Sequence, residues 1–170
     1  MSVSLPDIVD ADRMVAARRS FQGSLPIATM SRLVEALAAP VGAVAYELDF
    51  GKDGFGVSFL ALHATTELNL ICQRSLESFF LAVTLDLRLG LITREEDEAG
   101  LPPDYEALLT RDGQICLAEV IEDELLLAVP LIPIKPGQEE SDVVWSTGPL
   151  SEPEPVRVNP FATLDRLKNR

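Results

Sequence analysis

The segment Cys72-Gln73-Arg74-Ser75 has the residue types that come nearest to a reactive site in this 170-residue chain. It has the form of a Cys-x-x-Cys pair with serine in the second position. Two cysteines at that spacing would supply half of a zinc site or a redox couple. A single cysteine supplies neither, and Cys116 is the only other one. We therefore expect no metal and no cofactor, and we interpret Cys116 as a small packing residue.

The remaining polar residues do not combine into an obvious catalytic motif. His63 is the only histidine, and no nucleophile or orienting acid lies near it in the sequence, so we interpret it as a structural strand residue. Glu119, Glu122, Asp123 and Glu124 could form a carboxylate site, but their spacing fits the solvated face of a helix better. A glycine-rich phosphate loop and a Gly-x-Ser-x-Gly elbow are both missing from the sequence. These residues predict a binding protein, not an enzyme, and no small-molecule substrate.

Hydrophobic periodicity predicts the elements that position these residues. Alternation of period two is clearest over residues 79–89, and apolar residues at helical spacing occur in three places. We expect helices over 12–20, 29–39 and 115–128, strands over 41–50, 55–72 and 79–89, a turn at 51–54, and a surface loop over 93–113. This order predicts an α+β fold, with an antiparallel sheet from residues 41–92 packed by two or three helices. The pattern does not decide whether the sheet closes into a barrel.

The composition divides the chain into three parts. We expect a single globular domain over residues 1–134 and an acidic, proline-rich linker of low order over 135–158. A short amphipathic helix should follow over 159–170.

The C-terminal helix has a strong start signal. Asn159 is a favoured N-cap residue, and Pro160 follows at the first helical position. Phe161 and Leu164 would lie on the apolar side and are candidate anchors for a partner. The alternative is that this helix packs on its own domain, as apolar helix faces usually do.

The net charge of −13 is unevenly distributed. Residues 86–142 carry 15 acidic and four basic residues, whereas the last 12 residues have a net charge of +2. Such a chain gains little from non-specific attraction to phosphate, so a basic protein is the favoured partner. The N-terminus has no signal-peptide pattern, and no apolar run reaches the roughly 20 residues that span a bilayer. With only two cysteines, we expect a cytoplasmic protein that does not enter membranes.

Several short segments together resemble the YceD family of large ribosomal RNA subunit accumulation proteins. Each segment is weak alone, but their order and spacing cover nearly the whole chain. They are 17–23 (Ala-Arg-Arg-Ser-Phe-Gln-Gly), 72–74 (Cys-Gln-Arg), 101–106 (Leu-Pro-Pro-Asp-Tyr-Glu), 119–133 (Glu-Val-Ile-Glu-Asp-Glu-Leu-Leu-Leu-Ala-Val-Pro-Leu-Ile-Pro) and 159–164 (Asn-Pro-Phe-Ala-Thr-Leu). The chain departs from the family at Ser75, where a second cysteine is usual.

The resemblance implies a bacterial factor needed for normal levels of large-subunit ribosomal RNA. Our leading interpretation is a non-enzymatic ribosome biogenesis factor that contacts a large-subunit ribosomal protein or an assembly factor. The candidate partner-binding residues in the domain are Arg18, Arg19, Phe21 and Arg74. The alternative is a direct RNA-binding module, in which the three arginines face the phosphates of ribosomal RNA. Arg18 and Arg19 also have a simpler interpretation, because cations at a helix C-terminus complement the helix dipole.

Overall fold

The computed structural model describes residues 5–137 of the chain. Its elements, in chain order, are β1 (Ile8–Asp10), α1 (Ala11–Ala16), β2 (Ser20–Pro26), the 3-10 helix η1 (Ile27–Thr29), α2 (Ser31–Ala36), β3 (Ala43–Lys52), β4 (Ser58–Ile71), β5 (Ser78–Ile92), the 3-10 helix η2 (Glu95–Gly100), β6 (Glu106–Leu109), β7 (Gln114–Cys116) and α3 (Leu117–Ala128). No helix in this part of the chain is long and apolar enough to cross a membrane.

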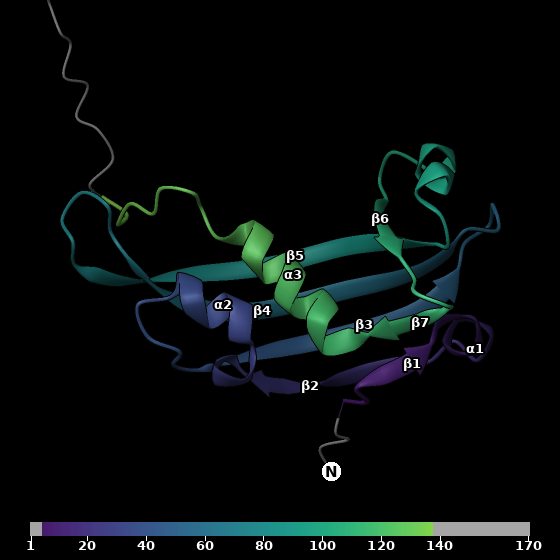
Figure 1. The fold of residues 1–170 in the computed structure, drawn as a ribbon, viewed down its shortest axis with the longest axis horizontal. Coiled ribbons are helices and arrows are strands. Elements are labelled where there is room, and N and C mark those ends of the chain that lie inside the picture. The colour runs from purple at the N-terminus through teal and green to yellow at the C-terminus, as the bar shows by residue number, and fades with distance from the viewer. Residues whose placement is uncertain (1–4, 138–170) are drawn as a thin grey trace, which may run out of the picture. The chain divides into compact units, whose positions relative to one another are not determined.

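The main sheet has five strands in the order β2-β3-β4-β5-β6 (Figure 1). Neighbouring strands from β2 to β5 are antiparallel, and β6 joins the edge beside β5 in parallel. The strands β1 and β7 form a separate antiparallel pair. Because β2 and β6 are both edges, the described sheet is open and does not close into a barrel. The predicted α+β class and the antiparallel β3–β5 meander are confirmed.

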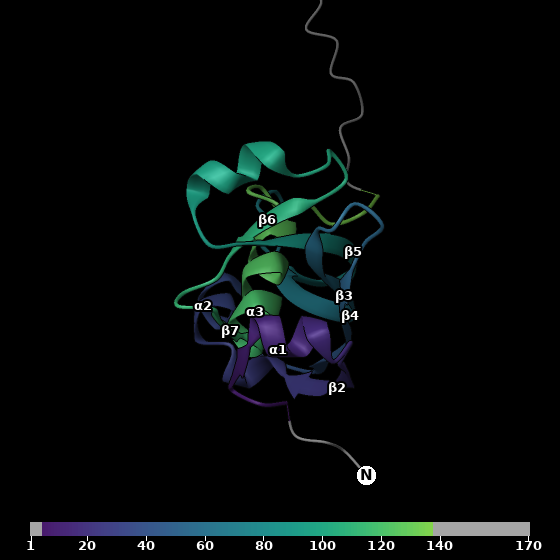
Figure 2. The same cartoon turned by 90° about the vertical axis from the view of Figure 1, so that its right-hand side faces the viewer.

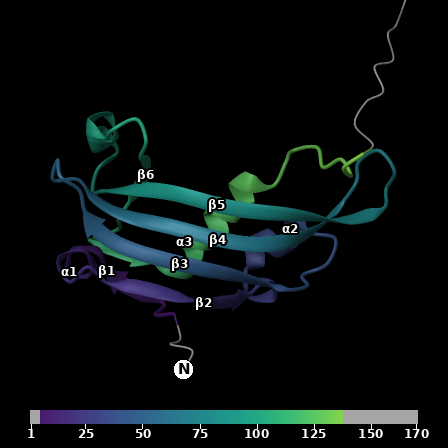
Figure 3. The same ribbon diagram turned by 180° about the vertical axis from the view of Figure 1, so that it is seen from behind.

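The helices α2 and α3 cover one face of the sheet, so sheet and helices form two layers (Figure 2). Alternate residues of β3, β4 and β5, such as Leu48, Leu62 and Leu89, are buried beneath them. They form one core with Ile121 and Leu125 of α3. Each such side chain contributes about 2 kcal/mol by leaving water. The opposite face of β2–β5 is not covered by these helices (Figure 3), and we call it the open face.

The predicted helix over 12–20 is wrong in its second half. The helix α1 ends at Ala16, Arg18 adopts a positive φ of 45°, and Ser20 begins the edge strand β2. A left-handed residue ends a right-handed helix, and pairing with β3 then favours the extended form. Gly23 is needed within this strand, because a Cβ there would lie 2.7 Å from the Tyr46 hydroxyl oxygen.

The predicted surface loop over 93–113 is more structured than its acidic run suggests. It contains η2 and the short strand β6. Leu101 packs where a side chain on Gly90 would otherwise lie, with its methyl carbon 2.6 Å from the ideal Cβ position. The Tyr105 hydroxyl donates a hydrogen bond to the Asp53 carboxylate at 3.2 Å. These long-range contacts are invisible to periodicity, so the sequence prediction missed both β6 and the nearby β7.

Candidate functional site

The segment Cys72–Ser75 forms the tip of the β4–β5 hairpin. The Leu76 N–H donates to the Cys72 carbonyl oxygen at 2.8 Å, and the Cys72 N–H donates to the Glu77 carbonyl oxygen at 2.9 Å. Leu76 adopts a positive φ of 60°, which a bulky L-residue takes only where surrounding contacts impose it. The turn therefore holds an exposed leucine in a left-handed conformation, which the hydrogen bonds on both sides of the tip impose.

The sulfur of Cys72 is buried and surrounded by hydrogen-bond donors. The N–H groups of Lys135 and Ser75 donate to Sγ at 3.4 and 3.5 Å. The Ser75 hydroxyl, with these two N–H groups, lowers the Cys72 pKa from 9.0 to about 6. The oxygen of that hydroxyl is buried and has no partner of hydrogen-bond geometry among the described residues. The two N–H groups that donate to Sγ, with the Ser75 hydroxyl beside them, therefore favour the thiolate.

The hairpin tip does not bring together a set of metal ligands. His63 lies on β4, nine residues before Cys72, which follows the end of that strand; at roughly 3.3 Å per residue the two are about 30 Å apart. Among residues 5–137, no group of three His, Cys, Asp or Glu side chains is arranged to hold a metal ion. The hairpin tip is thus a hydrogen-bonded turn around one sulfur atom.

We expect the contribution of Cys72 to stability to depend on pH. Its pKa is lower in the folded protein, so the stabilisation is fully present above the ordinary value of 9.0 and is lost as the pH falls towards about 6. The melting temperature of the wild type, minus that of Cys72→Ser, should therefore increase as the pH is raised through this range. The variant Cys116→Ser, measured in parallel, shows the general effect of replacing a cysteine with serine. A flat profile for Cys72→Ser would show that the thiolate is not preferentially stabilised by folding.

The chain that follows α3 packs along the hairpin tip. The Gln73 N–H donates to the Pro133 carbonyl oxygen at 2.8 Å. The Lys135 Nζ forms an ion pair with the Glu77 carboxylate at 3.3 Å. Two segments that resemble the same family, around Cys72 and before Pro133, are therefore neighbours in space although about 60 residues separate them in the sequence.

These two neighbouring segments expose large apolar side chains. The exposed residues are Leu76, Leu131, Ile132 and Ile134, and we call them, with the exposed Arg74, the hairpin platform. Exposed apolar residues on two neighbouring segments, with a cation on one of them, are typical of a protein-binding surface. The predicted strands over 55–72 and 79–89 already place Arg74 in the connection between them, and the structure adds the exposed apolar residues of the two segments.

The arginines Arg18 and Arg19 lie at the opposite end of the sheet from Arg74. The strand β2 begins beside them at Ser20, whose register leads across β3 to Ala61 on β4. The end of β4 near Arg74 is ten residues further along, which is about 33 Å at roughly 3.3 Å per residue. The three arginines therefore do not form one phosphate-binding patch.

Arg19 and Phe21 have structural contacts of their own. The Arg19 guanidinium lies over the Phe21 ring, 6.0 Å from its centroid. The Phe21 ring packs edge-on against Phe50 at 6.4 Å and is only partly exposed. The Phe50 N–H donates to the Arg19 carbonyl oxygen at 2.9 Å. These contacts fix the end of the sheet, while Arg18 and the guanidinium of Arg19 remain exposed. The other predicted contact residues, Asn159, Pro160, Phe161 and Leu164, lie outside the described residues.

The acidic side of α3 is not uniformly solvated, so the sequence interpretation of Glu122 is wrong. Glu122 is only 7% exposed. Its carboxylate accepts the backbone N–H groups of Arg32 and Leu33 at 2.7 and 3.1 Å. The Arg32 guanidinium also pairs with Glu122 at 3.3 Å and with the exposed Asp123. The buried Glu122 therefore joins α3 to α2 and has a structural role. Its neighbour Glu124 is affected differently: burial, together with the charges of Glu106 and Asp123, raises the pKa of Glu124.

The open face carries a row of ionisable side chains across its centre. His63 of β4 lies in register between Glu47 of β3 and Asp86 of β5, and all three are exposed. His63 is therefore an exposed residue of β4, and its predicted place on a strand is confirmed. The alternating exposed positions of β5 were visible in the sequence and could have identified this face. What periodicity could not supply was the register that aligns the three strands.

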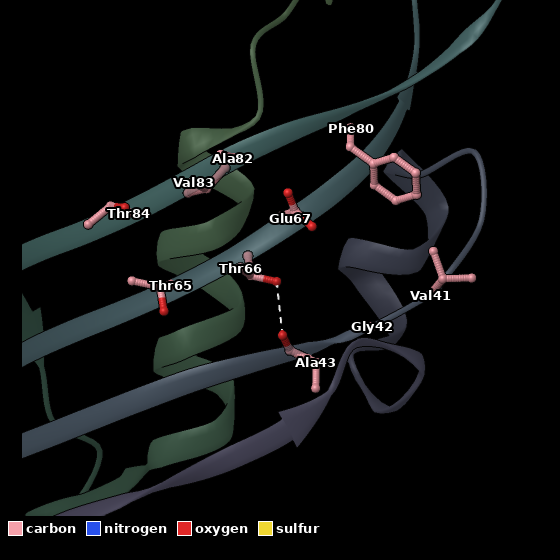
Figure 4. Close-up of a pocket in the computed structure, with 10 residues that line it drawn as sticks. All are labelled: Val41, Gly42, Ala43, Thr65, Thr66, Glu67, Phe80, Ala82, Val83 and Thr84. Carbon is pink, nitrogen blue, oxygen red and sulfur yellow. Dashed lines mark hydrogen bonds between the residues drawn. The ribbon is translucent and has the colours of Figure 1, made fainter.

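Beside this row, the open face is hollowed by small side chains. One hollow of about 610 Å³ extends from Thr65 and Thr84 towards Glu67, with Phe80 and Val41 near one end (Figure 4). A second hollow of about 480 Å³ is lined by Gln22, Gly23, Ala45, Tyr46, Glu47, His63 and Thr65. Thr65 lines both hollows, so they adjoin on the open face.

Comparison with known proteins gives one consistent result. The family described as "Large ribosomal RNA subunit accumulation protein YceD" matches residues 60–168. A Haemophilus influenzae protein with the same description is 27% identical over 171 residues, which cover 99% of this chain and 98% of that protein. No solved structure matches the chain significantly. The matched range includes the hairpin platform, α3, β5 and nearly all of β4, whereas β2 and β3 precede it.

Proposed function

Because the chain belongs to the YceD family of large ribosomal RNA subunit accumulation proteins, we propose that it supports accumulation of 23S ribosomal RNA and assembly of the large ribosomal subunit without catalysing a reaction. It acts in the cytoplasm through contacts with a ribosomal protein or an assembly factor. The observation that carries this proposal is the hairpin platform, where exposed apolar side chains gather on two segments within the family match.

The charge of the domain favours a basic protein as the direct partner. Residues 5–137 contain 21 acidic and 10 basic residues. Opposite charge speeds the encounter of two proteins and disfavours partners of the same sign. Large-subunit ribosomal proteins are basic because they bind RNA, so their charge complements this domain. An apolar platform on an acidic domain can then hold the encountered partner in a defined position.

Direct RNA binding is less well supported. It would require several phosphate contacts close together, since each contributes only a small part of the affinity. Arg18 and Arg19 are about 33 Å or more from Arg74 along the sheet, by the strand rise of roughly 3.3 Å per residue. The carboxylates of the open face lie between these two ends and repel phosphate.

Deleting residues 159–170 is expected to weaken association with precursor large-subunit particles about tenfold, while the domain stays folded. The predicted helix would bind a second site on the partner, and its tether to the domain would raise its effective concentration there. Co-sedimentation of the full-length and truncated chains with precursor particles measures the effect. The double variant Phe161→Ser/Leu164→Ser keeps the chain length and should reproduce the loss. Unchanged co-sedimentation of both variants would mean that this end does not contribute to binding.

A further inference from the structure

The open face has carboxylates without partners among the described residues. Glu47, Glu67 and Asp86 are exposed and form no ion pair within residues 5–137. The fourth carboxylate of this face, that of Asp49, accepts a hydrogen bond from Ser20. The only arginine on the face, Arg88, lies over the Phe59 ring, 5.6 Å from its centroid, and is therefore already engaged. The centre of the face thus presents net negative charge.

The shape of the face complements this charge. The hollows of about 610 and 480 Å³ adjoin at Thr65, and alanine and threonine side chains form much of their lining. Hollows of this kind leave room for a chain segment above the strands, with Thr65 and Thr84 able to donate hydrogen bonds from their hydroxyl groups. The exposed ring of Phe80, beside the hollow that Glu67 also lines, offers a surface for stacking a guanidinium.

We propose that the open face binds an extended, Lys- or Arg-rich segment of the protein partner. This inference rests on the proposed function and deepens it by naming the chemistry of the partner and the surface that binds it. Glu47 and Asp86 are two strands apart, about 10 Å, and Glu67 lies four residues beyond the His63 row, about 13 Å. Side chains on one side of an extended peptide repeat about every 7 Å. Alternate long cations on one peptide can therefore reach all three carboxylates.

Two other occupants fit the face less well. An RNA strand would bring phosphates to the unpaired carboxylates and would be repelled. A second copy related by a two-fold axis would set this acidic face against itself, which like charge disfavours.

The binding test uses the full-length chain and a fluorescein-labelled nonapeptide of alternating Lys and Thr, with the matching Glu/Thr peptide as a negative control. Fluorescence anisotropy at low salt should detect binding of the Lys/Thr peptide and no binding of the Glu/Thr peptide. The triple variant Glu47→Gln/Glu67→Gln/Asp86→Asn should weaken binding tenfold or more. The matched variant Glu95→Gln/Glu96→Gln/Glu98→Gln removes the same charge from η2, where these residues are exposed, and should change affinity less than threefold.

A steric variant separates the hollow from the charge. Thr65→Trp places a large side chain where both hollows meet, keeps the charge and suits a strand, so it should also weaken binding tenfold or more. Equal losses in the two charge variants, or no loss in Thr65→Trp, would overturn the inference. A dimer that Thr65→Trp disrupts would also overturn it, because the face would then be occupied by a second copy. Tighter peptide binding after removal of residues 159–170 would do the same, because the face would then be occupied by the chain's own C-terminal segment.

A complementation experiment distinguishes this inference from the proposed function. The wild-type chain is expected to restore the 23S ribosomal RNA level in cells that lack the protein, and the triple open-face variant is expected to restore it poorly. Full restoration by the triple variant would contradict the inference and leave the proposed function intact. Failure of the wild-type chain to restore the RNA level would contradict the proposed function itself.

Discussion

Replacing Glu122 with alanine is expected to lower the free energy of unfolding by about 3 kcal/mol, because removing one partner of a buried charged network leaves the others unsatisfied. The change removes the carboxylate that accepts the Arg32 and Leu33 N–H groups, so these two donors at the start of α2 lose their hydrogen-bond partner. It also removes the contact that joins α2 to α3 over the core. Chemical denaturation of the purified protein measures the loss as a shift of the unfolding midpoint.

Asp123→Ala is the matched control for this prediction. Asp123 pairs with the same Arg32 guanidinium, but both side chains are about half exposed. An exposed ion pair typically contributes less than about 1 kcal/mol, so this variant should be close to the wild type. Glu122→Gln, which keeps one acceptor oxygen, should lie between the two. Equal, small effects at both positions would show that Glu122 belongs to a solvated face, as its helical spacing first suggested.

The second large effect is expected at the hairpin platform. The double variant Leu131→Ser/Ile132→Ser should weaken association with precursor large-subunit particles about 100-fold, which corresponds to roughly 1.4 kcal/mol for each apolar anchor of the interface. Both side chains are exposed in the domain, so the variant should leave its stability nearly unchanged. Co-sedimentation with precursor particles, alongside a thermal unfolding curve, measures binding and stability separately.

Phe55→Ser is a suitable control for the platform. Phe55 is a large apolar residue that is 94% exposed, in the turn between β3 and β4. That turn lies at the end of the sheet opposite the β4–β5 hairpin (Figure 1). If exposed apolar area alone promoted association, Phe55→Ser would weaken binding as much as the platform variant does. We expect a change of less than threefold, and a platform variant that still binds like the wild type would remove the principal support for the proposed surface.

The helix α3 illustrates the limit of predicting helices by spacing. The predicted helix over 115–128 is confirmed, and Val120, Ile121 and Leu125 lie on its buried face. Glu122 follows Ile121 directly and was assigned to water because of its charge. It is buried because the N-terminal turn of α2 lies against it and supplies N–H donors, and that neighbour is 89 residues away in the sequence.

The strands β3, β4 and β5 and the helix α3 were determined by the sequence alone, because alternation and helical spacing report which side of each element is apolar. The position of residues 73–78 between two predicted strands also followed from this local pattern. Tertiary structure alone decided the edge strand β2, the parallel strand β6 and the register of His63 with its neighbours. It also brought Pro133 to Gln73 and separated Arg18 from Arg74. Each of these depends on pairing or packing between segments distant in the chain, and periodicity within one segment carries no information about its partner.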